Sequence, residues 1–276
     1  MIQDVYGFPL NVAEYQDFRF LERYGLPFSV EAQPEDGTVC LGLDGPRYGR
    51  LCLRFAGARL TDGIAPEEAV ARLQAAMPCY EALYPHPALI KLQGSGPAAG
   101  GYCAIFRWWE GVPLRDDAAW QALWRLPLLS RLRMIDDVFD FHVYAAEMGY
   151  VPVNFSGRCV LADLAAGRAA VCGIDRYRRM PAVNDLGRMP GSPRFLAPEE
   201  YQLGAALDGR TVQYTLGALA FAFFADRSLR DRCAWTAGEA LYQVAVRACN
   251  EDAAARYDSP RAFLAAWRKA VEDACP

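Results

Sequence analysis

The stretch CGIDRYRRMPAVNDLGRMPGSPRFLAPEE, residues 172–200, decides how the rest of this chain can be interpreted. It begins in a short apolar run that ends at an acid, Asp175, and it closes on Ala197-Pro198-Glu199. A long loop that carries several arginines lies between the two. The pattern predicts a buried strand that ends at a carboxylate, followed by a long loop.

The bulk composition is that of an ordinary globular protein. A chain of 276 residues, 53% hydrophobic and 22% charged, suits one large or two small domains with a sizeable core. The net charge of -4 gives no reason to expect nucleic acid or an anionic membrane as partner. The first residues lack the basic and apolar regions of a signal peptide. The longest apolar run, residues 216–225, is far shorter than the roughly 20 residues that span a bilayer. We therefore expect a cytoplasmic protein.

The nine cysteines are scattered, without a CxxC pair, and most of them lie in apolar runs. This usage favours reduced, buried thiols in a cytosolic protein. The chain has only two histidines, so the sequence does not favour a zinc site.

The first part of the chain predicts a small sheet with one helix. Residues 1–30 are rich in aromatic side chains, and we expect a short helix or lead-in that packs on the first lobe. A helix is predicted at residues 66–83, where a proline and two acids precede apolar residues at helical spacing. Strands are predicted at residues 38–43, 51–55, 86–90 and 102–106, the first two as a hairpin.

The second part predicts mainly helices. The longest covers residues 118–148 and ends before Gly149, a plausible C-terminal cap. Further helices are predicted at residues 216–224, 235–250 and 259–273, and short strands at 159–161 and 170–174. We therefore predict an α+β protein, β-rich before residues 107–114 and α-rich after them.

Segment 172–200 resembles the activation segment of protein kinases, and further motifs of that family follow one another in the family's order. The resemblance covers roughly residues 18–270. It implies a two-lobe protein-kinase-like fold of the Ser/Thr protein kinase superfamily. The N-lobe would be residues 1–106, the hinge 107–114 and the helical C-lobe 115–276. Segments such as LCLRFAGA, residues 51–58, also resemble a group of bacterial protein-kinase-like proteins.

In the N-lobe the resemblance implies a nucleotide site with altered residues. Arg54 stands where the family has the lysine that binds the nucleotide phosphates, and residues 72–76 offer no acid in place of the αC glutamate. Phe106 occupies the gatekeeper place, and Trp108 follows it in the hinge beside Trp109. The two tryptophans could plug the adenine pocket or line it. The implied cofactors are ATP and Mg²⁺.

In the C-lobe the resemblance implies a substituted catalytic loop. Asn154 takes the place of the catalytic aspartate, and Cys159 takes that of the metal-binding asparagine. Asp175 opens the counterpart of the Asp-Phe-Gly motif and is the implied metal ligand that survives. Arg256 stands where the family has the arginine that pairs with Glu199, so we predict a buried ion pair between these two residues.

Each altered position has two interpretations. Asn154 cannot accept a proton as a carboxylate does, and general base catalysis is worth about 10²–10⁴-fold, but an amide can still hold the loop by hydrogen bonds. Cys159 offers sulfur where Mg²⁺ prefers oxygen, or it simply packs beside a strand. Arg54 could contact a phosphate or form a structural ion pair. Asp175 could bind a metal or cap a turn.

Two loops also have alternatives. Residues 33–42 stand in the place of the glycine-rich loop, but two glycines and two acids make a poor phosphate nest and favour a plain hairpin turn. Before Ser192, Tyr177 is the one hydroxyl after Asp175, so phosphorylation of the loop would need one of these two residues. The arginines of the segment, at positions 176, 178, 179, 188 and 194, form a solvated face or a dock for an acidic partner.

These departures lead us to expect a pseudokinase, a kinase-like protein whose phosphotransfer is lost or very weak and which works as a binding or regulatory module. The expected partner is another protein. The alternative is an active ATP-dependent Ser/Thr protein kinase with a protein substrate, in which Asp163 or Asp175 binds the metal and Arg54 the phosphates. A kinase fold reused for another transfer from ATP is a third interpretation.

Overall fold

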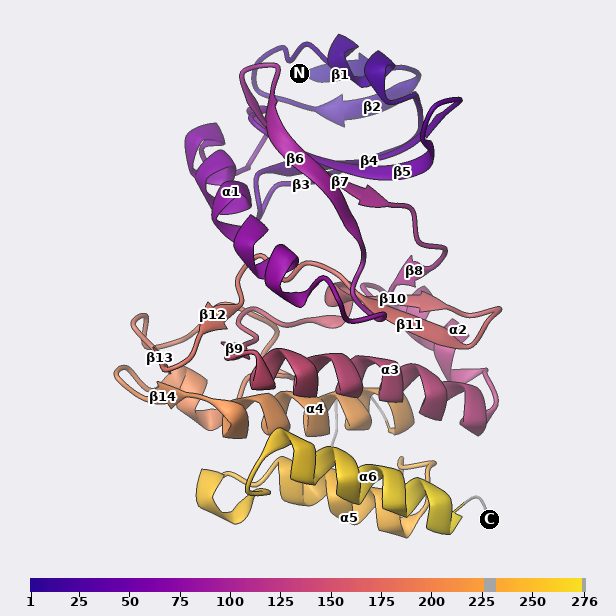
Figure 1. The fold of residues 1–276 in the computed structure, drawn as a ribbon, viewed down its shortest axis with the longest axis vertical. Coiled ribbons are helices and arrows are strands. Elements are labelled where there is room, and N and C mark those ends of the chain that lie inside the picture. Colours follow the sequence, from indigo (N-terminus) through magenta and orange to yellow (C-terminus); the bar gives the residue numbers. More distant parts are fainter. Residues whose placement is uncertain (226–231, 275–276) are drawn as a thin grey trace. The chain divides into compact units, whose positions relative to one another are not determined.

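The computed structural model describes residues 1–225 and 232–274 and divides into two compact units. Unit 1 comprises Met1–Tyr84 and Ile90–Trp109, and unit 2 comprises Pro85–Leu89 and Glu110–Pro276. The described residues form six α-helices and several small sheets (Figure 1), so the protein is α+β as predicted. Among the described residues, none of the helices combines the length and the apolar character needed to cross a bilayer.

Unit 1 is built on an antiparallel sheet whose five described strands lie in the order β3-β4-β5-β7-β6. The helix α1 (Pro66–Leu83) comes between β5 and β6 along the chain and has the predicted bounds. The strands predicted at 38–43, 51–55 and 102–106 are also confirmed. The sheet consists of β3 (Leu26–Gln33), β4 (Thr38–Gly45), β5 (Gly49–Ala56), β6 (Leu92–Ala98) and β7 (Gly101–Arg107).

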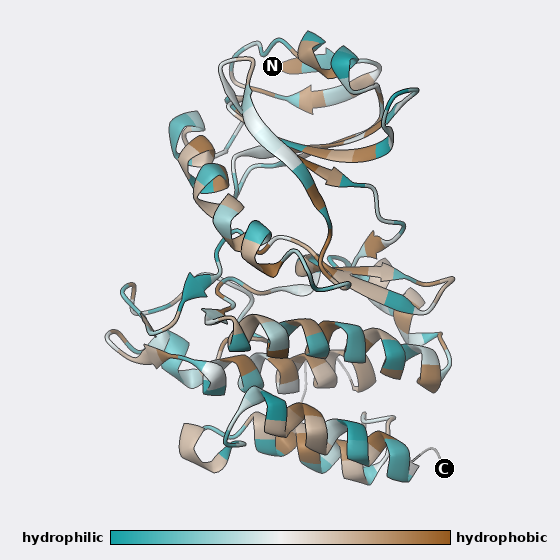
Figure 2. Cartoon of the chain, in the orientation of Figure 1, coloured by the Kyte–Doolittle hydropathy of each residue, from teal (hydrophilic) through white to brown (hydrophobic). Residues whose placement is uncertain are grey.

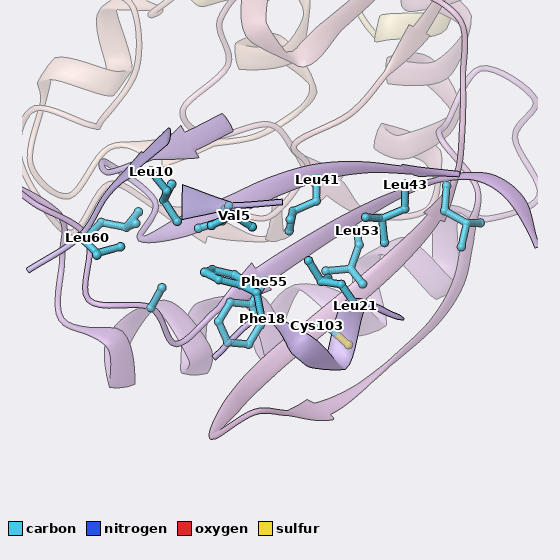
Figure 3. Close-up of a cluster of buried hydrophobic side chains, with 14 residues drawn as sticks. Val5, Leu10, Phe18, Leu21, Leu41, Leu43, Leu53, Phe55, Leu60 and Cys103 are labelled. Carbon is cyan, nitrogen blue, oxygen red and sulfur yellow. The ribbon is translucent and has the colours of Figure 1, made fainter. Parts of the chain in front are cut away.

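The two faces of this sheet are covered by different elements. Leu41, Leu53 and Phe55 point to one face and share a buried cluster with residues of the first 21 positions, such as Leu10 and Leu21 (Figure 3). On the opposite face, alternation places Arg54 and Phe106. Helix α1 contacts that face, since the ring of Tyr80 lies 5.0 Å from that of Phe106.

Residues 1–30 form the expected lead-in that packs on the sheet, although most of this segment is not helical. The chain forms a hairpin of β1 (Ile2–Val5) and β2 (Phe8–Asn11), then the short 3₁₀ helix η1 (Arg19–Arg23). Tyr6 and Gly7 both have positive φ, at 54° and 92°, as a tight two-residue hairpin turn requires.

The prediction of a strand at residues 86–90 was wrong, because this segment forms a turn. The backbone here turns on His86, whose carbonyl accepts the N–H of Leu89 at 3.2 Å and whose Nδ1 accepts that of Ala88 at 3.2 Å. Only Leu89 forms a bridge, with Val171 of unit 2. The strand of unit 1 begins after this turn, at Leu92.

Unit 2 is mainly helical. The predicted helix at 118–148 is two helices, because Pro127 has no N–H to donate and stands at the N-cap of the second. The predicted end at Gly149 is confirmed, with φ at 81°. The helices are α2 (Asp117–Trp124), α3 (Leu128–Glu147), α4 (Gly209–Phe224), α5 (Glu239–Ala248) and α6 (Pro260–Ala274), so those predicted near 216–224, 235–250 and 259–273 are confirmed.

Aromatic side chains join the helices of unit 2. Hydrophilic and hydrophobic residues alternate along α6 (Figure 2), and its buried Phe263 and Trp267 lie 5.1 and 5.2 Å from Phe139 of α3. Helix α4 is buried along most of its length, as its apolar sequence predicts.

Short strands connect these helices. They are β8 (Val112–Pro113), β9 (Tyr150–Val151), β10 (Val160–Asp163), β11 (Arg168–Val171), β12 (Arg178–Arg179), β13 (Ala182–Val183) and β14 (Ala206–Leu207). Strand β10 pairs with β11 and β8, β12 with β9, and β13 with β14. The pairs β9–β12 and β13–β14 lie at the same end of unit 2 (Figure 1), where segment 172–200 runs between them.

Candidate functional site

Asn154 lies in the turn between β9 and the 3₁₀ helix η2 (Gly157–Cys159). Its φ is 63°, in the left-handed region that asparagine tolerates better than most residues. Within the described residues its side chain makes no hydrogen bond or ion pair. The loop is held by its neighbour instead, since the buried ring of Phe155 lies 5.1 Å from that of His142 and 5.6 Å from that of Phe195.

Gly191 of segment 172–200 lies directly on this turn. A Cβ atom at Gly191 would stand 3.2 Å from Cα of Asn154 and 3.1 Å from a methyl carbon of Leu196. The φ of Gly191 is 137°, which also favours glycine. The structure thus brings the closing half of the segment against the predicted catalytic residue.

Cys159 is buried beside the residues that lead to Asp175. Its carbonyl accepts the N–H of Cys172 at 2.9 Å, and its Sγ lies 4.0 Å from the carbonyl oxygen of Gly173. The hairpin β10–β11 holds these two stretches side by side. Cys159 and the stretch that carries Asp175 are therefore neighbours, but the thiol is directed at a backbone carbonyl.

Asp163, the other acid considered for a metal, ends β10 and caps the turn that follows. Its Oδ1 accepts the N–H groups of Ala165 and Ala166 at 3.1 and 2.9 Å. These bonds give its carboxylate a structural role in the hairpin.

Tyr177 is tied to helix α3 through a buried histidine. Its hydroxyl lies 2.7 Å from Nε2 of His142, and Nδ1 of His142 lies 2.7 Å from the carbonyl oxygen of Val138. Since a carbonyl only accepts, Nδ1 carries the proton, and Nε2 accepts from Tyr177. Burial lowers the pKa of His142 to about 4, so the ring is neutral at pH 7. A buried, hydrogen-bonded Tyr177 is not accessible to a modifying kinase in this conformation.

The predicted ion pair between Glu199 and Arg256 is confirmed. Two nitrogens of Arg256 donate to the two carboxylate oxygens of Glu199 at 2.8 and 3.0 Å, and the Arg256 side chain is 0% exposed. Arg256 also donates to the carbonyls of Asn250 and Arg210 at 2.8 and 2.9 Å. Burial works against the charged form of Glu199, but the hydrogen bonds from Arg256 outweigh it and lower the pKa of Glu199.

The pKa of Glu200, the next residue along the chain, is shifted in the opposite direction from that of Glu199. Glu200 is only 2% exposed, and its carboxylate accepts the N–H of Ala197 at 2.8 Å. Burial, aided by the nearby charge of Glu199, raises the pKa of Glu200 to about 7. Sequence reasoning missed this group, because nothing in the sequence distinguishes its environment from that of Glu199 beside it.

The arginines of segment 172–200 mostly contact the segment itself or its surroundings. Arg178 donates to Asp185 at 2.8 Å and to the carbonyl of Val183 at 3.0 Å. Arg179 lies over the ring of Tyr150 at 4.9 Å, and Arg188 over that of Tyr201 at 5.9 Å. Together with the Glu199 and Tyr177 contacts, these interactions order the segment without any phosphate.

In unit 1, Arg54 lies in the middle of β5 and is buried. Its Nη2 is 3.5 Å from Oγ1 of Thr38 on the neighbouring strand. Helix α1 has no acid at the predicted position, and its Arg72 pairs with Glu68 of the same helix at 2.6 Å.

The other two predicted nucleotide-site residues of unit 1 are packed against aromatic rings. Phe106 is buried against Tyr80, and Trp108 lies 4.7 Å from the ring of Phe28. A Cβ atom at Gly42 would stand 2.6 Å from the Phe28 ring, so this ring covers β4. Arg50 lies over both rings, at 4.4 and 4.7 Å. Sequence reasoning missed Phe28, which only the strand register brings to Trp108.

The segment expected in place of a glycine-rich loop is the β3–β4 hairpin. The N–H of Asp36 donates to Gln33 and that of Gly37 to Pro34, both at 3.1 Å. Gly37 has φ at 66°, so the hairpin closes by an ordinary tight turn.

The donor chemistry does not suit a magnesium ion. Mg²⁺ takes oxygen ligands, whereas the two predicted metal positions of unit 2 offer one carboxylate, Asp175, and one thiol, Cys159. Over residues 1–225 and 232–274, no group of three or more His, Cys, Asp or Glu side chains is placed to hold a metal ion.

The chain matches no known family model, and no curated protein resembles it in sequence.

Proposed function

We propose that this chain is a cytoplasmic, protein-kinase-like protein of the bacterial type that does not transfer phosphate and that works as a binding or regulatory module. The element order supports the kinase-like part. Unit 1 has the sheet order β3-β4-β5-β7-β6 with α1 between its third and fourth strands along the chain. Unit 2 has a strand, the acid Asp175, a long loop and the Glu199 anchor, followed by helices.

A retained anchor beside a substituted catalytic loop is the observation that carries the proposal. Glu199 and Arg256 keep their bidentate contact, while Asn154, against which Gly191 packs, cannot act as a general base. Phosphoryl transfer depends on positioned charge, and the charges are what this loop lacks. Because catalytic residues act as a unit, their separate losses are not multiplied.

The residues of unit 1 also argue against productive nucleotide binding. Arg54 replaces a lysine with a larger, planar group. The Phe28 ring covers β4 at Gly42 and packs against the ring of Trp108, which follows β7. We infer that the two rings fill the place where the adenine of a bound nucleotide would lie.

The order of segment 172–200 supports a binding role. In kinases that are switched by phosphorylation, a phosphate orders this segment. Here the segment is held by Tyr177 on His142, by Arg178 on Asp185 and by Glu199 on Arg256. A surface that is permanently ordered can bind a partner without a prior modification.

Thermal unfolding with millimolar ATP, with and without Mg²⁺ or Mn²⁺, tests this proposal. A ligand at about 100 times its dissociation constant stabilises a protein by roughly 2.7 kcal/mol. We expect no metal-dependent shift and no transfer of labelled phosphate to the chain or to casein.

A matched variant makes the test sharper. Arg54→Lys, Asn154→Asp and Cys159→Asn together restore the residues of the family at three positions, and Phe28→Leu removes the covering ring. If the fold is kinase-like, the combined variant should gain a metal-dependent shift that Asp175→Asn removes again. A metal-dependent shift in the unaltered chain, lost in Asp175→Asn and accompanied by phosphotransfer, would instead establish the active-kinase alternative.

A further inference from the structure

Four exposed hydrophobic side chains lie around the second half of segment 172–200. They are Val183, Leu186, Tyr201 and Leu203, exposed by 50%, 59%, 44% and 73%. Single exposed hydrophobic residues are normal, whereas a group of them on one surface marks an interaction site. We refer to these four residues as the 183–203 patch.

The buried side chain of Asn184 holds the patch together. Its Oδ1 accepts the N–H groups of Leu186 and Gly187, and its Nδ2 donates to the carbonyls of Gly187 and Glu199. The Asn184 backbone adds two bonds, from its N–H to Ala205 and to its carbonyl from Gly204, at 2.9 and 2.8 Å. Residues 183–187 and 199–205 are therefore one hydrogen-bonded unit that presents the four side chains in a fixed arrangement.

Two exposed arginines accompany the patch on this part of unit 2. Arg188 lies over Tyr201, a member of the patch. Arg179 lies on β12, close in sequence to Val183, and stacks on Tyr150. Neither arginine has a carboxylate partner among the described residues. The nearby acids are engaged elsewhere, because Asp185 pairs with Arg178 and Glu199 with Arg256.

We propose that the 183–203 patch, with Arg179 and Arg188, is a docking surface for an acidic segment of a partner protein that also carries aliphatic side chains. This inference rests on the proposed function and names the partner of that binding module. The chain as a whole is acidic, with a net charge of -4, so a surface with unpaired arginines is a local departure that selects acidic partners. Tyrosine and arginine are also the residues that dominate binding at protein interfaces.

A fluorescein-labelled peptide of alternating glutamate and leucine probes this surface, by fluorescence anisotropy with the full chain and without nucleotide. Two comparison peptides alternate lysine with leucine and glutamate with serine. We expect binding of the Glu/Leu peptide, at least about ten-fold weaker binding of each comparison peptide, and weakening of the complex by salt.

Matched variants assign the binding to the patch. Leu186→Ser with Leu203→Ser, and separately Arg179→Glu with Arg188→Glu, should each weaken binding at least about ten-fold. Leu129→Ser is the apolar control, since Leu129 is 52% exposed on α3. Arg23→Glu with Arg47→Glu is the charge control, because these arginines also lie over tyrosine rings, at 5.6 and 5.1 Å. The controls should leave binding unchanged. The unfolding temperature of each variant confirms that it folds.

Four results would overturn the inference. They are no binding of the Glu/Leu peptide, equal binding of the Lys/Leu peptide, no effect of either patch variant on binding, and a dimer in sedimentation experiments that the Leu186→Ser and Leu203→Ser changes dissociate. The last result would assign the patch to a second copy of the chain.

This test is separate from that of the proposed function. A chain that turns over ATP and still binds the Glu/Leu peptide would lose the pseudokinase proposal and keep the docking surface. An inert chain that does not bind it would do the reverse.

Discussion

At the scale of single residues, the contact between Tyr177 and His142 predicts a specific loss of stability. Tyr177→Phe removes the hydroxyl and leaves the buried Nε2 of His142 without its donor, which should cost about 1–3 kcal/mol. Tyr257→Phe is the control, since Tyr257 is equally buried and its hydroxyl makes no hydrogen bond to the described residues. Urea unfolding of both variants measures the difference. Equal losses would mean that the bond to His142 contributes nothing.

Glu200 predicts a dependence of stability on pH. Its pKa in the folded protein is about 7, above its ordinary value of 4.5, so the folded state holds the proton more tightly than the unfolded state. The resulting stabilisation is complete below about pH 4.5 and is lost as the pH rises through 7, by up to about 3 kcal/mol. Glu200→Gln keeps an acceptor for Ala197 and cannot ionise.

Urea unfolding at several pH values between about 5 and 8 checks this prediction. The unaltered chain should lose stability relative to Glu200→Gln as the pH rises through this window. Comparison of the two proteins cancels the effect of His142. Its lowered pKa acts in the opposite direction, giving stability that is lost as the pH falls below about 6.5. Parallel curves would contradict a raised pKa at Glu200.

Single residues also show which contacts of the candidate site the amino-acid sequence can predict. The pair of Glu199 and Arg256 could be predicted, because each stands at a recognisable place beside a short motif. The contact of Tyr177 with His142 and that of Phe28 with Trp108 could not. These pairs are distant in sequence, and only helix phase and strand register bring them together.

At the scale of elements, the Glu199–Arg256 pair fastens segment 172–200 to the C-terminal helices. Glu199→Ala should cost about 3–5 kcal/mol, because it leaves the charge of Arg256 buried and without its carboxylate. Glu147→Ala is the matched control, since it breaks an equally short bidentate pair with Arg261 on the exposed surface and should change stability little. Thermal unfolding compares the two. Similar small losses of stability in the two variants would show that the buried pair does not hold segment 172–200 to the C-terminal helices.

The packing of segment 172–200 on the Asn154 turn gives a second prediction at this scale. Gly191→Ala adds a methyl group against Cα of Asn154 and strains a φ of 137°. Backbone strain alone costs about 1–3 kcal/mol of folding stability, and the steric contact should raise the loss above that. Gly187→Ala has a positive φ of 80° but nothing within 4 Å of the new carbon, so it reports the backbone strain alone. Hydrogen exchange at Asn154 and Phe155 should rise in Gly191→Ala and not in Gly187→Ala. Equal hydrogen exchange in the two variants would mean that the packing of Gly191 does not stabilise the Asn154 turn.

The elements that were predicted wrongly share a physical cause. Helices such as α1 were predicted to the residue, because their apolar spacing and their start signals agree. The hairpin at residues 1–11 was missed because its two strands have only four residues each and rest on a sheet formed later in the sequence. The run at 86–90 is apolar without being a strand, since its hydrophobic residues are buried by tertiary contacts rather than by a ladder.

At the scale of the whole molecule, the chain passes from one unit to the other three times, after Tyr84, Leu89 and Trp109. Residues Pro85–Leu89 belong to unit 2, although residues on both sides of them belong to unit 1. Nε2 of His86 lies 3.0 Å from Asp140 of α3, and the carbonyl of Ala88 accepts the N–H of Val171. A fragment that begins at Glu110 loses these contacts, so unit 2 depends for its completeness on a short stretch from the N-terminal half.

Cysteine labelling reads the burial of both units in one experiment. Of the cysteines in the described residues, Cys233 is exposed, and Cys79, Cys103, Cys159 and Cys249 are buried. Burial also raises the pKa of the Cys52 thiol to about 11, which keeps it protonated and unreactive. In a Cys275→Ser background, which removes the cysteine that lies outside the described residues, we expect Cys233 to react first with a disulfide reagent. The four buried thiols should react only as fast as the chain unfolds.

Mass spectrometry assigns each rate to its residue, and Cys233→Ser should abolish the fast phase. Cys159 is the informative thiol, because it ends η2 with its Sγ toward the backbone carbonyl of Gly173, which makes it a packing residue rather than a ligand. Its rate should be slow and should be the same with and without ATP and Mg²⁺. If Cys159 reacts as fast as Cys233, the thiol is open to a ligand. If ATP and Mg²⁺ then protect it, the metal position that the kinase resemblance implies is in use, and the active-kinase alternative must be reconsidered.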